Sequence, residues 1–488
     1  MPYNVPQNID PDKIFLVNFS ELEGRWDPTI FQNQFRFVSK QYTNRKLSSV
    51  ALIDPKVSFS KLKDDDDISF IPMNTVNEDD GTIKESLYKK VLETKGFTRF
   101  QNGDLIWAKI TPCMQNGKSA VVRNLRNGYG CGSTEFFVIR PKSDDLLIDY
   151  IYIILRDNRF LQTATKYFGG SAGQQRVPKN FLENLIIPIL PLHIQQQIVD
   201  VYNAALSLRK KKLSVSKAKL ASIDQYLLDE LGITLPQKDN SLEKRIFTVN
   251  FSKVSGRRLD PKCYSTESQL INDAISKGTY ECRMLKEFLV HSIAGDWGYD
   301  ENEEKTNSEK CLVIRSTEFD NEYNLKLDNS RAKYRNILKN KLDNINLQVG
   351  DLLIEKSGGS EEQPVGRVAI ITDEILSFGN ICYSNFIHKI SVTDILPEYL
   401  YCYLKTAHNI KLTDSMQSQT NGLRNLILKE YFNQLIPLPP LEKQREIANN
   451  ISAIRAEAKR LEQEGEEILQ SARLQVEHII LGEKDIEG

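Results

Sequence analysis

The sequence predicts an α+β protein with two homologous, β-rich domains separated by two long antiparallel helices, which pack as a coiled coil with pseudo-twofold symmetry. Three observations predict this fold class: a tandem duplication, short β-branched segments between Gly and Asn turns in each copy, and a long helical pattern that follows each copy. The chain has 488 residues, which is enough for roughly three domains of ~150 residues.

The duplication is visible in segments that recur in the same order. A Gly-Asp dipeptide opens the apolar stretches at 103–112 (GDLIWAKITP) and 350–359 (GDLLIEKSGG). A Pro-rich stop followed by Gln-x-x-Ile recurs at 186–198 and 435–447. This period is far longer than that of a solenoid repeat, so the pattern predicts two whole domains, each followed by its own helix.

These repeats set the expected boundaries, because each Pro-rich stop precedes a helical pattern. The predicted parts are a first domain at 1–190, a central helix at 191–232, a second domain at 233–437 and a C-terminal helix at 438–482.

Apolar residues recur at steps of three and four along both predicted helices, as they do in a coiled-coil seam. Each helix is expected to span about 35–40 residues, or roughly 50–60 Å at 1.5 Å per residue. Because a long amphipathic helix needs a partner for its apolar stripe, we expect the two helices to pair. The residues expected to make this pairing are Ile198, Val201, Leu208, Ile447, Ile451, Ile454, Leu461 and Ile468.

Composition excludes several classes of protein. The formal charge of −1 excludes a uniformly basic protein but allows local basic surfaces. No run of 18 apolar residues and no charged, then apolar, N-terminal segment is present, so we expect neither a membrane span nor a secretory signal. The seven cysteines include no C-x2-C pair and the five histidines are scattered, so we expect no metal site and a reducing, cytoplasmic setting.

Motifs of common DNA-acting enzymes are missing from the sequence. The glycine-rich segment at 169–174 lacks the Lys-Ser/Thr of a phosphate-binding loop, and no Asn/Asp-Pro-Pro-Tyr/Phe tetrapeptide of amino-methyltransferases occurs. The nearest nuclease-like group, Asp351 with Glu355 and Lys356, has its last two residues adjacent, so they would point to opposite faces of a strand. We therefore expect no catalytic residue and no cofactor in this chain.

Two groups of polar residues point to nucleic acid. The first copy has six Lys or Arg and two acids between Arg99 and Arg140, and both copies carry an amide-rich loop with an Arg before the helix. Amides can read adenine, and Arg can read guanine or bind phosphate. An ordinary polar surface loop is the alternative for either loop alone. The predicted DNA-binding residues are Lys109, Thr111, Gln115, Asn116, Lys118, Gln174, Gln175, Arg176, Lys356, Ser357, Arg367, Gln417, Gln419, Asn421 and Arg424.

With these motifs the whole chain resembles the DNA-specificity subunit of type I restriction-modification systems. The resemblance lies in the duplicated Gly-Asp strand, the Gly-Gln-Gln-Arg-Val loop at 173–177, and the segment PLPPLEKQREI at 437–447 that opens the C-terminal helix; the run PILPLH at 188–193 departs from the family's commoner pattern.

The resemblance implies that each domain is a target-recognition domain that reads one half of a bipartite double-stranded DNA site. It further implies that the helices set the half-site spacing and dock two modification (methyltransferase) subunits, which are joined by restriction/translocase subunits in a prokaryotic cytoplasm. S-adenosylmethionine, ATP and Mg would then belong to those partners. Two alternatives stay open: a stand-alone nuclease or methyltransferase, and a duplicated protein-interaction scaffold.

Overall fold

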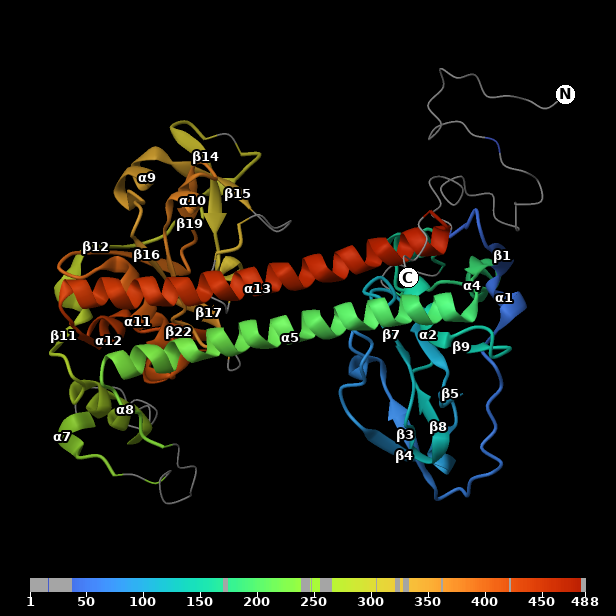
Figure 1. The fold of residues 1–488 in the computed structure, drawn as a ribbon. Coiled ribbons are helices and arrows are strands. Elements are labelled where there is room, and N and C mark those ends of the chain that lie inside the picture. The colour runs from blue at the N-terminus through green and yellow to red at the C-terminus, as the bar shows by residue number, and fades with distance from the viewer. Residues whose placement is uncertain are drawn as a thin grey trace. The chain divides into compact units, whose positions relative to one another are not determined.

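A computed structural model describes residues 16, 37–169, 174–237, 246, 248–254, 266–303, 305–320, 325–327, 333–360, 363–420 and 423–483. The chain divides into two compact units (Figure 1), and the boundaries between them fall inside both long helices. The first unit comprises residues 1–212 and 462–488, and the second comprises 213–461. Each unit thus contains one β-rich domain together with a part of each long helix.

The first unit alternates short strands and short helices. Its elements before the long helix are β1 (Thr43–Lys46), α1 (Leu47–Val50), β2 (Ala51–Ile53), β3 (Asp67–Ile71), β4 (Leu87–Lys90), β5 (Thr98–Gln101), β6 (Leu105–Ala108), β7 (Ser119–Val121), β8 (Tyr129–Gly132), β9 (Phe136–Pro141), α2 (Ile148–Ile154), α3 (Asn158–Thr165), α4 (Lys179–Asn184) and β10 (Ile186–Ile189). Two four-stranded sheets result, in the orders β2-β9-β6-β7 and β4-β3-β8-β5, and β1 pairs with β10 to close the domain.

The second unit repeats this plan with some additions. Its elements between the long helices are α7 (Phe251–Val254), α8 (Thr266–Ser276), β11 (Cys282–Met284), β12 (Leu289–Ala294), β13 (Tyr299–Asp300), β14 (Ser308–Ile314), β15 (Tyr334–Leu338), α9 (Lys339–Ile345), β16 (Leu352–Glu355), β17 (Ser357–Gly359), β18 (Val368–Ile370), α10 (Asp373–Leu376), β19 (Ile381–Tyr383), β20 (Ile387–Val392), α11 (Pro397–Asn409), β21 (Gln417–Thr420), β22 (Leu423–Leu426), α12 (Leu428–Phe432) and β23 (Leu435–Pro437).

Sheet topology confirms the predicted duplication. The order β12-β20-β16-β18 repeats β2-β9-β6-β7, and the parallel pair β14-β19 repeats the parallel pair β3-β8. The closing pair β11-β23 likewise repeats β1-β10. The second unit adds a three-stranded sheet, β17-β22-β21.

The repeated Gly-Asp dipeptide forms the same turn in both units. Gly103 and Gly350 adopt φ values of 84° and 88°, a conformation that suits glycine because it has no Cβ. The Asp that follows is buried and accepts a main-chain hydrogen bond from the residue three positions earlier, with a distance of 2.8 Å for both Asp104 and Asp351. The motif therefore fixes the entry into β6 and β16, the central strands of the two equivalent sheets.

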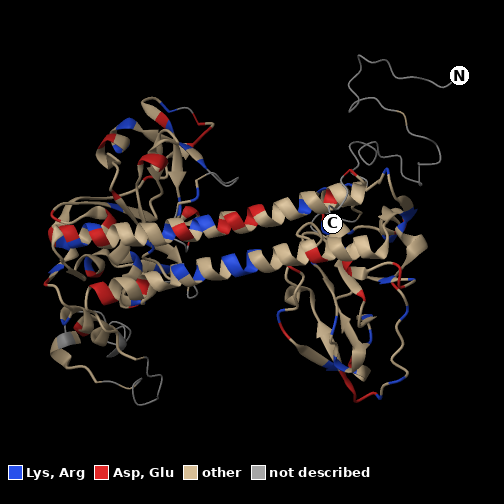
Figure 2. Cartoon of the chain, viewed as in Figure 1, with Lys and Arg blue, Asp and Glu red and all other residues tan. Residues whose placement is uncertain are grey.

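The two long helices are α5 (Leu192–Glu230, 39 residues) and α13 (Leu441–Leu481, 41 residues). Their lengths agree with the helices that the sequence predicted. Lys and Arg (blue) and Asp and Glu (red) lie along both long helices (Figure 2). In the first unit, Arg209 pairs with Glu466 and Lys212 with Glu464, at 2.6 Å each. In the second unit, Lys443 pairs with Glu230 at 2.6 Å and Asn450 donates to the Tyr226 hydroxyl. Residue numbers rise along one helix as they fall along the other, so the helices run antiparallel in each unit.

The predicted pairing residues differ in burial. Ile198, Ile447 and Ile451 are fully buried, whereas Val201, Ile454, Leu461 and Ile468 are partly buried. Leu208 is 45% exposed and borders a hollow with Glu464 and Ile468 of α13. On α5, Tyr202 and Ala205 are buried, and the Arg209 side chain is 16% exposed. A search for apolar residues alone missed the cationic residues Arg209 and Lys212, whose stems can cover the partner helix while their charges pair with Glu.

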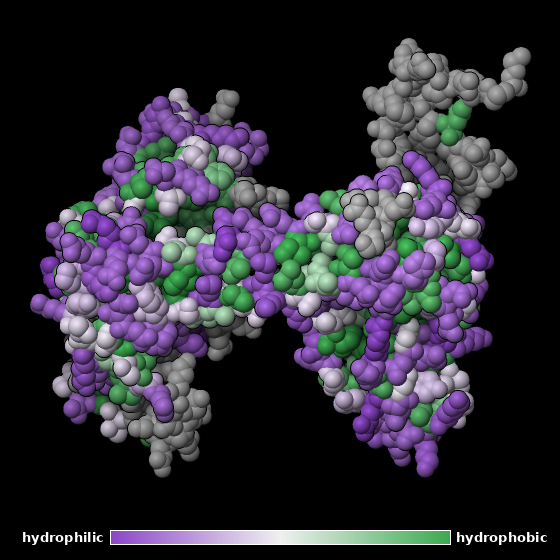
Figure 3. Space-filling model, viewed as in Figure 1, coloured by the Kyte–Doolittle hydropathy of each residue, from purple (hydrophilic) through white to green (hydrophobic). Residues whose placement is uncertain are grey.

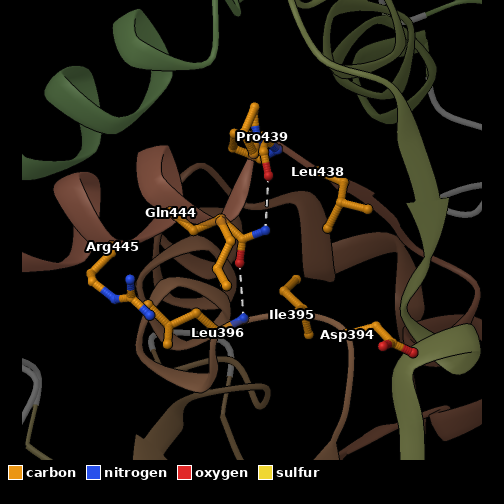
Figure 4. A pocket seen from close by; sticks show the side chains of 9 residues that line it. Asp394, Ile395, Leu396, Leu438, Pro439, Gln444 and Arg445 are labelled. Atoms are coloured by element: carbon orange, nitrogen blue, oxygen red, sulfur yellow. Dashed lines mark hydrogen bonds between the residues drawn. The ribbon is translucent and has the colours of Figure 1, made fainter.

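A glutamine near the start of each long helix anchors it to its domain. In the second unit, the Gln444 side chain accepts from Leu396 N at 2.8 Å and donates to Pro439 O at 2.9 Å, beside an open hollow of about 610 Å³ (Figure 4). In the first unit, Gln195 accepts from Leu147 N and donates to Leu190 O, both at 2.8 Å. These two equivalent pairs of hydrogen bonds explain why Gln recurs just after the Pro-rich stop.

Polar side chains dominate the visible face of each unit, with smaller apolar patches between them (Figure 3). Six cysteines lie within the described residues, and all six are free thiols. No helix in the described part of the chain is long and apolar enough to cross a membrane.

Candidate nucleic-acid interface

The structure brings the polar residues predicted in the first copy onto adjoining segments. The chain after β6 runs beside the chain that follows the glycine-rich loop: Val177 N donates to Lys109 O at 2.9 Å, and Thr111 N donates to Gln175 O at 3.0 Å. Lys109, Thr111, Gln174, Gln175 and Arg176 therefore share one surface. We call this surface, together with Gln115, Asn116 and Lys118, the first candidate surface.

Arg176 is paired on this surface with Glu135, a residue that the sequence analysis did not predict. The Arg176 Nε and Nη2 atoms lie 2.8 and 2.7 Å from the two Glu135 carboxylate oxygens, and Nη1 donates to Gln174 O at 3.0 Å. The hydrogen bonds from Arg176 hold the pKa of Glu135 below its usual range. The Arg176 side chain is still 40% exposed, so the pair lies at the surface.

The turn after Lys109 contributes further amides. The Thr111 hydroxyl donates to the Gln115 side chain, and Asn116 Nδ2 lies 3.3 Å from a Glu78 carboxylate oxygen. Gln115 and Asn116 are exposed and border a polar hollow of about 290 Å³ within the first unit. Lys118 lies half-buried where this turn leads into β7. All eight residues predicted in the first copy thus lie on two adjoining segments.

The second unit places three of its predicted residues, Lys356, Ser357 and Gln419, in an equivalent way. Lys356 O accepts from Leu426 N at 2.7 Å, and β17 pairs with β22, so Lys356 and Ser357 lie beside the β21-β22 hairpin that carries Gln419. Lys356 N donates to Phe386 O at 2.9 Å, just as Lys109 N donates to Glu135 O at 2.9 Å. We call the surface of Lys356, Ser357, Phe386 and Gln419 the second candidate surface.

Three predicted residues of the second copy are buried, which corrects their assignment to the surface. Arg367 is 5% exposed; its Nε and Nη2 bind the Glu355 carboxylate at 2.8 and 2.9 Å, and its Nη1 donates to Phe319 O. The Gln417 side chain donates inward to Val365 O and Thr413 O. Arg424 is also buried. Asn421 lies outside the described residues.

Glu135 and Phe386 are the surface residues that the sequence analysis missed. Both precede the equivalent strands β9 and β20, and both carbonyls accept from the equivalent lysines. Phe386 is 50% exposed. Alignment of the two copies along β9 and β20, rather than a search for polar residues, was the signal that could have found them.

A cation–aromatic contact lies behind the first candidate surface. Lys109 Nζ lies 5.0 Å from the centre of the Phe137 ring. In the second unit His388 occupies the register position of Phe137, because Trp107 pairs with Phe137 and Ile354 with His388. Burial, and next the nearby Lys356 charge, lower the pKa of His388 to about 4.

No group of three or more metal-ligating side chains occurs among the described residues. The two surfaces instead offer amides, hydroxyls, lysines and one arginine, which are groups that bind phosphates and base edges. The arrangement suits binding of a polar, anionic polymer.

Comparison with known proteins matches most of the chain to one family. Residues 39–215 and 279–470 match a family model described as the type I restriction modification DNA specificity domain. The two matched ranges correspond to the two copies of the repeat, each with the beginning of the helix that follows it.

Two curated relatives from Escherichia coli carry the same similarity. The chain is 30% identical to the type I restriction enzyme EcoEI specificity subunit over 272 residues, which are 55% of this chain and 44% of that protein. It is 37% identical to the EcoAI specificity subunit over 212 residues, which are 43% of this chain and 35% of that protein. The aligned part thus spans less than half the length of either relative.

A solved structure shares the fold. A chain from a structure that describes complex assembly and conformational transition of the type I R-M system aligns over 91% of this chain and 97% of that chain. The TM-score is 0.52 and the sequence identity is 16%.

Proposed function

Because the chain belongs to the type I restriction-modification DNA-specificity family, we propose that it is the subunit that selects the DNA sequence in such a complex. Each β-rich domain would read one half of a bipartite double-stranded site. One observation carries the proposal: the two copies present candidate surfaces at equivalent places, beside the ends of β6 and β16. Two equivalent surfaces in one chain suit a target that has two separate halves.

The side chains on these surfaces fall into two groups, which would bind phosphates and base edges respectively. Lysines such as Lys109, Lys118 and Lys356 would supply affinity for phosphate that does not depend on sequence. Amides such as Gln174, Gln175 and Gln419 would supply discrimination between bases, and each good bidentate contact is worth ~1–3 kcal/mol. The sequence of the target follows from the exact placement of these groups on a duplex.

The long helices would serve assembly and spacing. We propose that they set the distance between the half-sites, up to roughly 15–18 base pairs for helices of this length at 3.4 Å per pair. We also propose that they dock two modification subunits, which restriction/translocase subunits join. Adenine methylation and ATP-driven cleavage, with S-adenosylmethionine, ATP and Mg, would then be functions of those partners, and this chain would be non-catalytic.

Binding of the full chain, assembled with its modification subunits, to a randomised duplex library tests the proposal. We expect enrichment of a site in two parts, and binding that weakens steeply with salt because phosphate contacts release counterions. The preferred duplex should then bind more weakly to Gln174→Ala, Gln175→Ala and Gln419→Ala variants.

Gln470→Ala, at an exposed position on α13, is the matched control and should leave DNA affinity unchanged. A wild-type complex that enriches no sequence would contradict DNA selection by this chain. Unchanged affinity in all three surface variants would contradict the assignment of the two surfaces.

A further inference from the structure

The ion pair between Arg176 and Glu135 has a geometry that goes beyond general DNA affinity. The carboxylate meets the guanidinium side-on, through Nε at 2.8 Å and Nη2 at 2.7 Å. Such a bidentate contact fixes the plane of the guanidinium as well as its position. On an exposed surface of a DNA-binding protein, this arrangement orients the remaining N–H groups of the arginine.

Main-chain hydrogen bonds hold both partners of the pair. Glu135 O accepts from Lys109 N at 2.9 Å, and Glu135 N donates to Ser133 Oγ at 3.2 Å. Arg176 exchanges two main-chain bonds with Gly169, both at 3.0 Å. Because the backbone is fixed at both ends, the side chain is ordered before any ligand arrives, and binding loses less conformational entropy.

A count of donors shows what is left for a ligand. The guanidinium has five N–H groups. Glu135 takes one on Nε and one on Nη2, and Gln174 O takes one on Nη1. Two N–H groups remain, one on each Nη nitrogen, on a side chain that is 40% exposed.

Charge favours a base over a phosphate as the acceptor. The Glu135 carboxylate neutralises the Arg176 charge and would repel a phosphate that approached the same guanidinium. A guanine edge carries no net charge and presents two acceptors, N7 and O6, in the major groove. Two directional donors on a neutralised arginine match that edge.

We propose that Arg176 reads a guanine in the half-site bound by the first unit, and that Glu135 is the positioning residue that orients it. This inference rests on the function proposed above. In the second unit Phe386 stands in the place of Glu135, since its carbonyl accepts from the equivalent Lys356 N. The guanine requirement set by this pair is therefore confined to one half-site.

The test uses the full chain with its modification subunits and the duplex that the wild type prefers. Replacement of one guanine, in one half-site, should weaken wild-type binding by about 5- to 150-fold. Arg176→Ala should remove the preference at that position and leave the other positions unchanged. Arg176→Lys should not restore it, because an ammonium cannot make the planar two-donor contact.

A modified base and a second variant separate reading from folding. Substitution of 7-deazaguanine removes the N7 acceptor, so wild-type affinity should fall at that position while Arg176→Ala is indifferent to the change. Glu135→Gln keeps the shape but removes the charge. We expect it to reduce the discrimination for guanine while its melting temperature stays close to that of the wild type.

Two outcomes would overturn the inference. Arg176→Ala could weaken all duplexes equally, as a phosphate contact would, or it could keep every base preference of the wild type. Either result, with a wild-type complex that still selects a bipartite sequence, contradicts only the guanine reading. A wild-type complex without any sequence preference contradicts the proposed function itself.

Discussion

The two units of the chain share a framework and differ in the side chains that complete it. Tyr150 and Tyr399 both donate to a proline carbonyl of the closing strand, at 2.9 and 2.8 Å. Gln195 and Gln444 both accept a hydrogen bond from a main-chain N–H of their own domain. These repeated residues satisfy buried main-chain groups, which cannot be left without partners. These Tyr and Gln residues therefore recur at positions where a side chain supplies a hydrogen bond that no other main-chain group supplies.

The differences concern charge and surface. Asp104 is bound by Arg140, whose side chain is 23% exposed, whereas Asp351 is bound by Lys389, whose side chain is 1% exposed. By strand register the place of Arg140 is taken by Ser391, which also donates to Asp351. At the candidate surfaces the first unit has the Glu135 carboxylate, which is 23% exposed, where the second unit has the Phe386 ring, which is 50% exposed. The same framework thus accommodates a buried Asp–Lys pair in the second unit and a partly hydrated Asp–Arg pair in the first.

The largest predicted loss of stability that tests this difference between the units comes from substitution of the two buried aspartates. Asp351→Ala leaves the Lys389 ammonium buried beside Asn346 O alone, and we expect a loss of about 3–5 kcal/mol in the free energy of unfolding. Asp104→Ala should cost less, because the Arg140 guanidinium can be hydrated after the change. Calorimetric unfolding of the full chain, with hydrogen exchange to assign the transition to a unit, measures both. Equal losses would contradict the contrast between the two pairs.

The next effect compares two positions on the long helices. Ile451→Ala removes a fully buried side chain and should destabilise the second unit by about 2–5 kcal/mol. Leu208→Ala removes an exposed side chain and should change stability by no more than about 0.5 kcal/mol. Chemical denaturation of each variant checks these values. A large loss of stability from Leu208→Ala would show that this side chain contributes to helix packing although it is exposed.

The smallest effect is the pH dependence of stability that the buried His388 gives to the second unit. His388 has a folded-state pKa of about 4 against an ordinary value of 6.5, because burial and Lys356 disfavour its charge. Below pH 6.5 the unfolded chain binds a proton that the folded chain does not, so stability falls as the pH drops toward 4. The loss at pH 5 relative to pH 7 should be about 2 kcal/mol.

His388→Phe, which installs the residue of the first unit at the same register, should remove the contribution of His388 and leave that of His408, whose pKa is also lowered by burial. Unfolding at pH 7 and pH 5 measures the difference, and His193→Gln, at an exposed position on α5, is the control for a histidine substitution. An equal loss in wild type and His388→Phe would show that the histidine is not its source.

The sequence predicted the features that depend on local pattern. The duplication, the two helices, their antiparallel pairing and the Gly-Asp turns follow from periodicity and turn chemistry, which act over a few residues. The sequence identified Lys109, Gln175 and Lys356 as polar candidates, and the fold places Lys109 beside Gln175 and Lys356 beside the β21-β22 hairpin.

The sequence could not predict which polar residues are buried. The Arg367 guanidinium is satisfied by Glu355, 12 positions away, and by Phe319 O, 48 positions away, and only the fold brings these groups together. The exposure of Leu208 and the ion pairs of Arg209 and Lys212 likewise depend on residues of the other long helix. Long-range partners decide burial, and an unaligned sequence does not reveal them.

Selective loss of one half-site tests the central claim, that each unit reads its own half of the target. The measurement is selection from a randomised duplex library by two variants of the assembled complex. One carries Gln174→Ala, Gln175→Ala and Arg176→Ala in the first unit, and the other carries Lys356→Ala and Gln419→Ala in the second. The account predicts that each variant relaxes a different half of the enriched sequence and retains the other half. Loss of both halves in either variant, or of neither half in both variants, would contradict it.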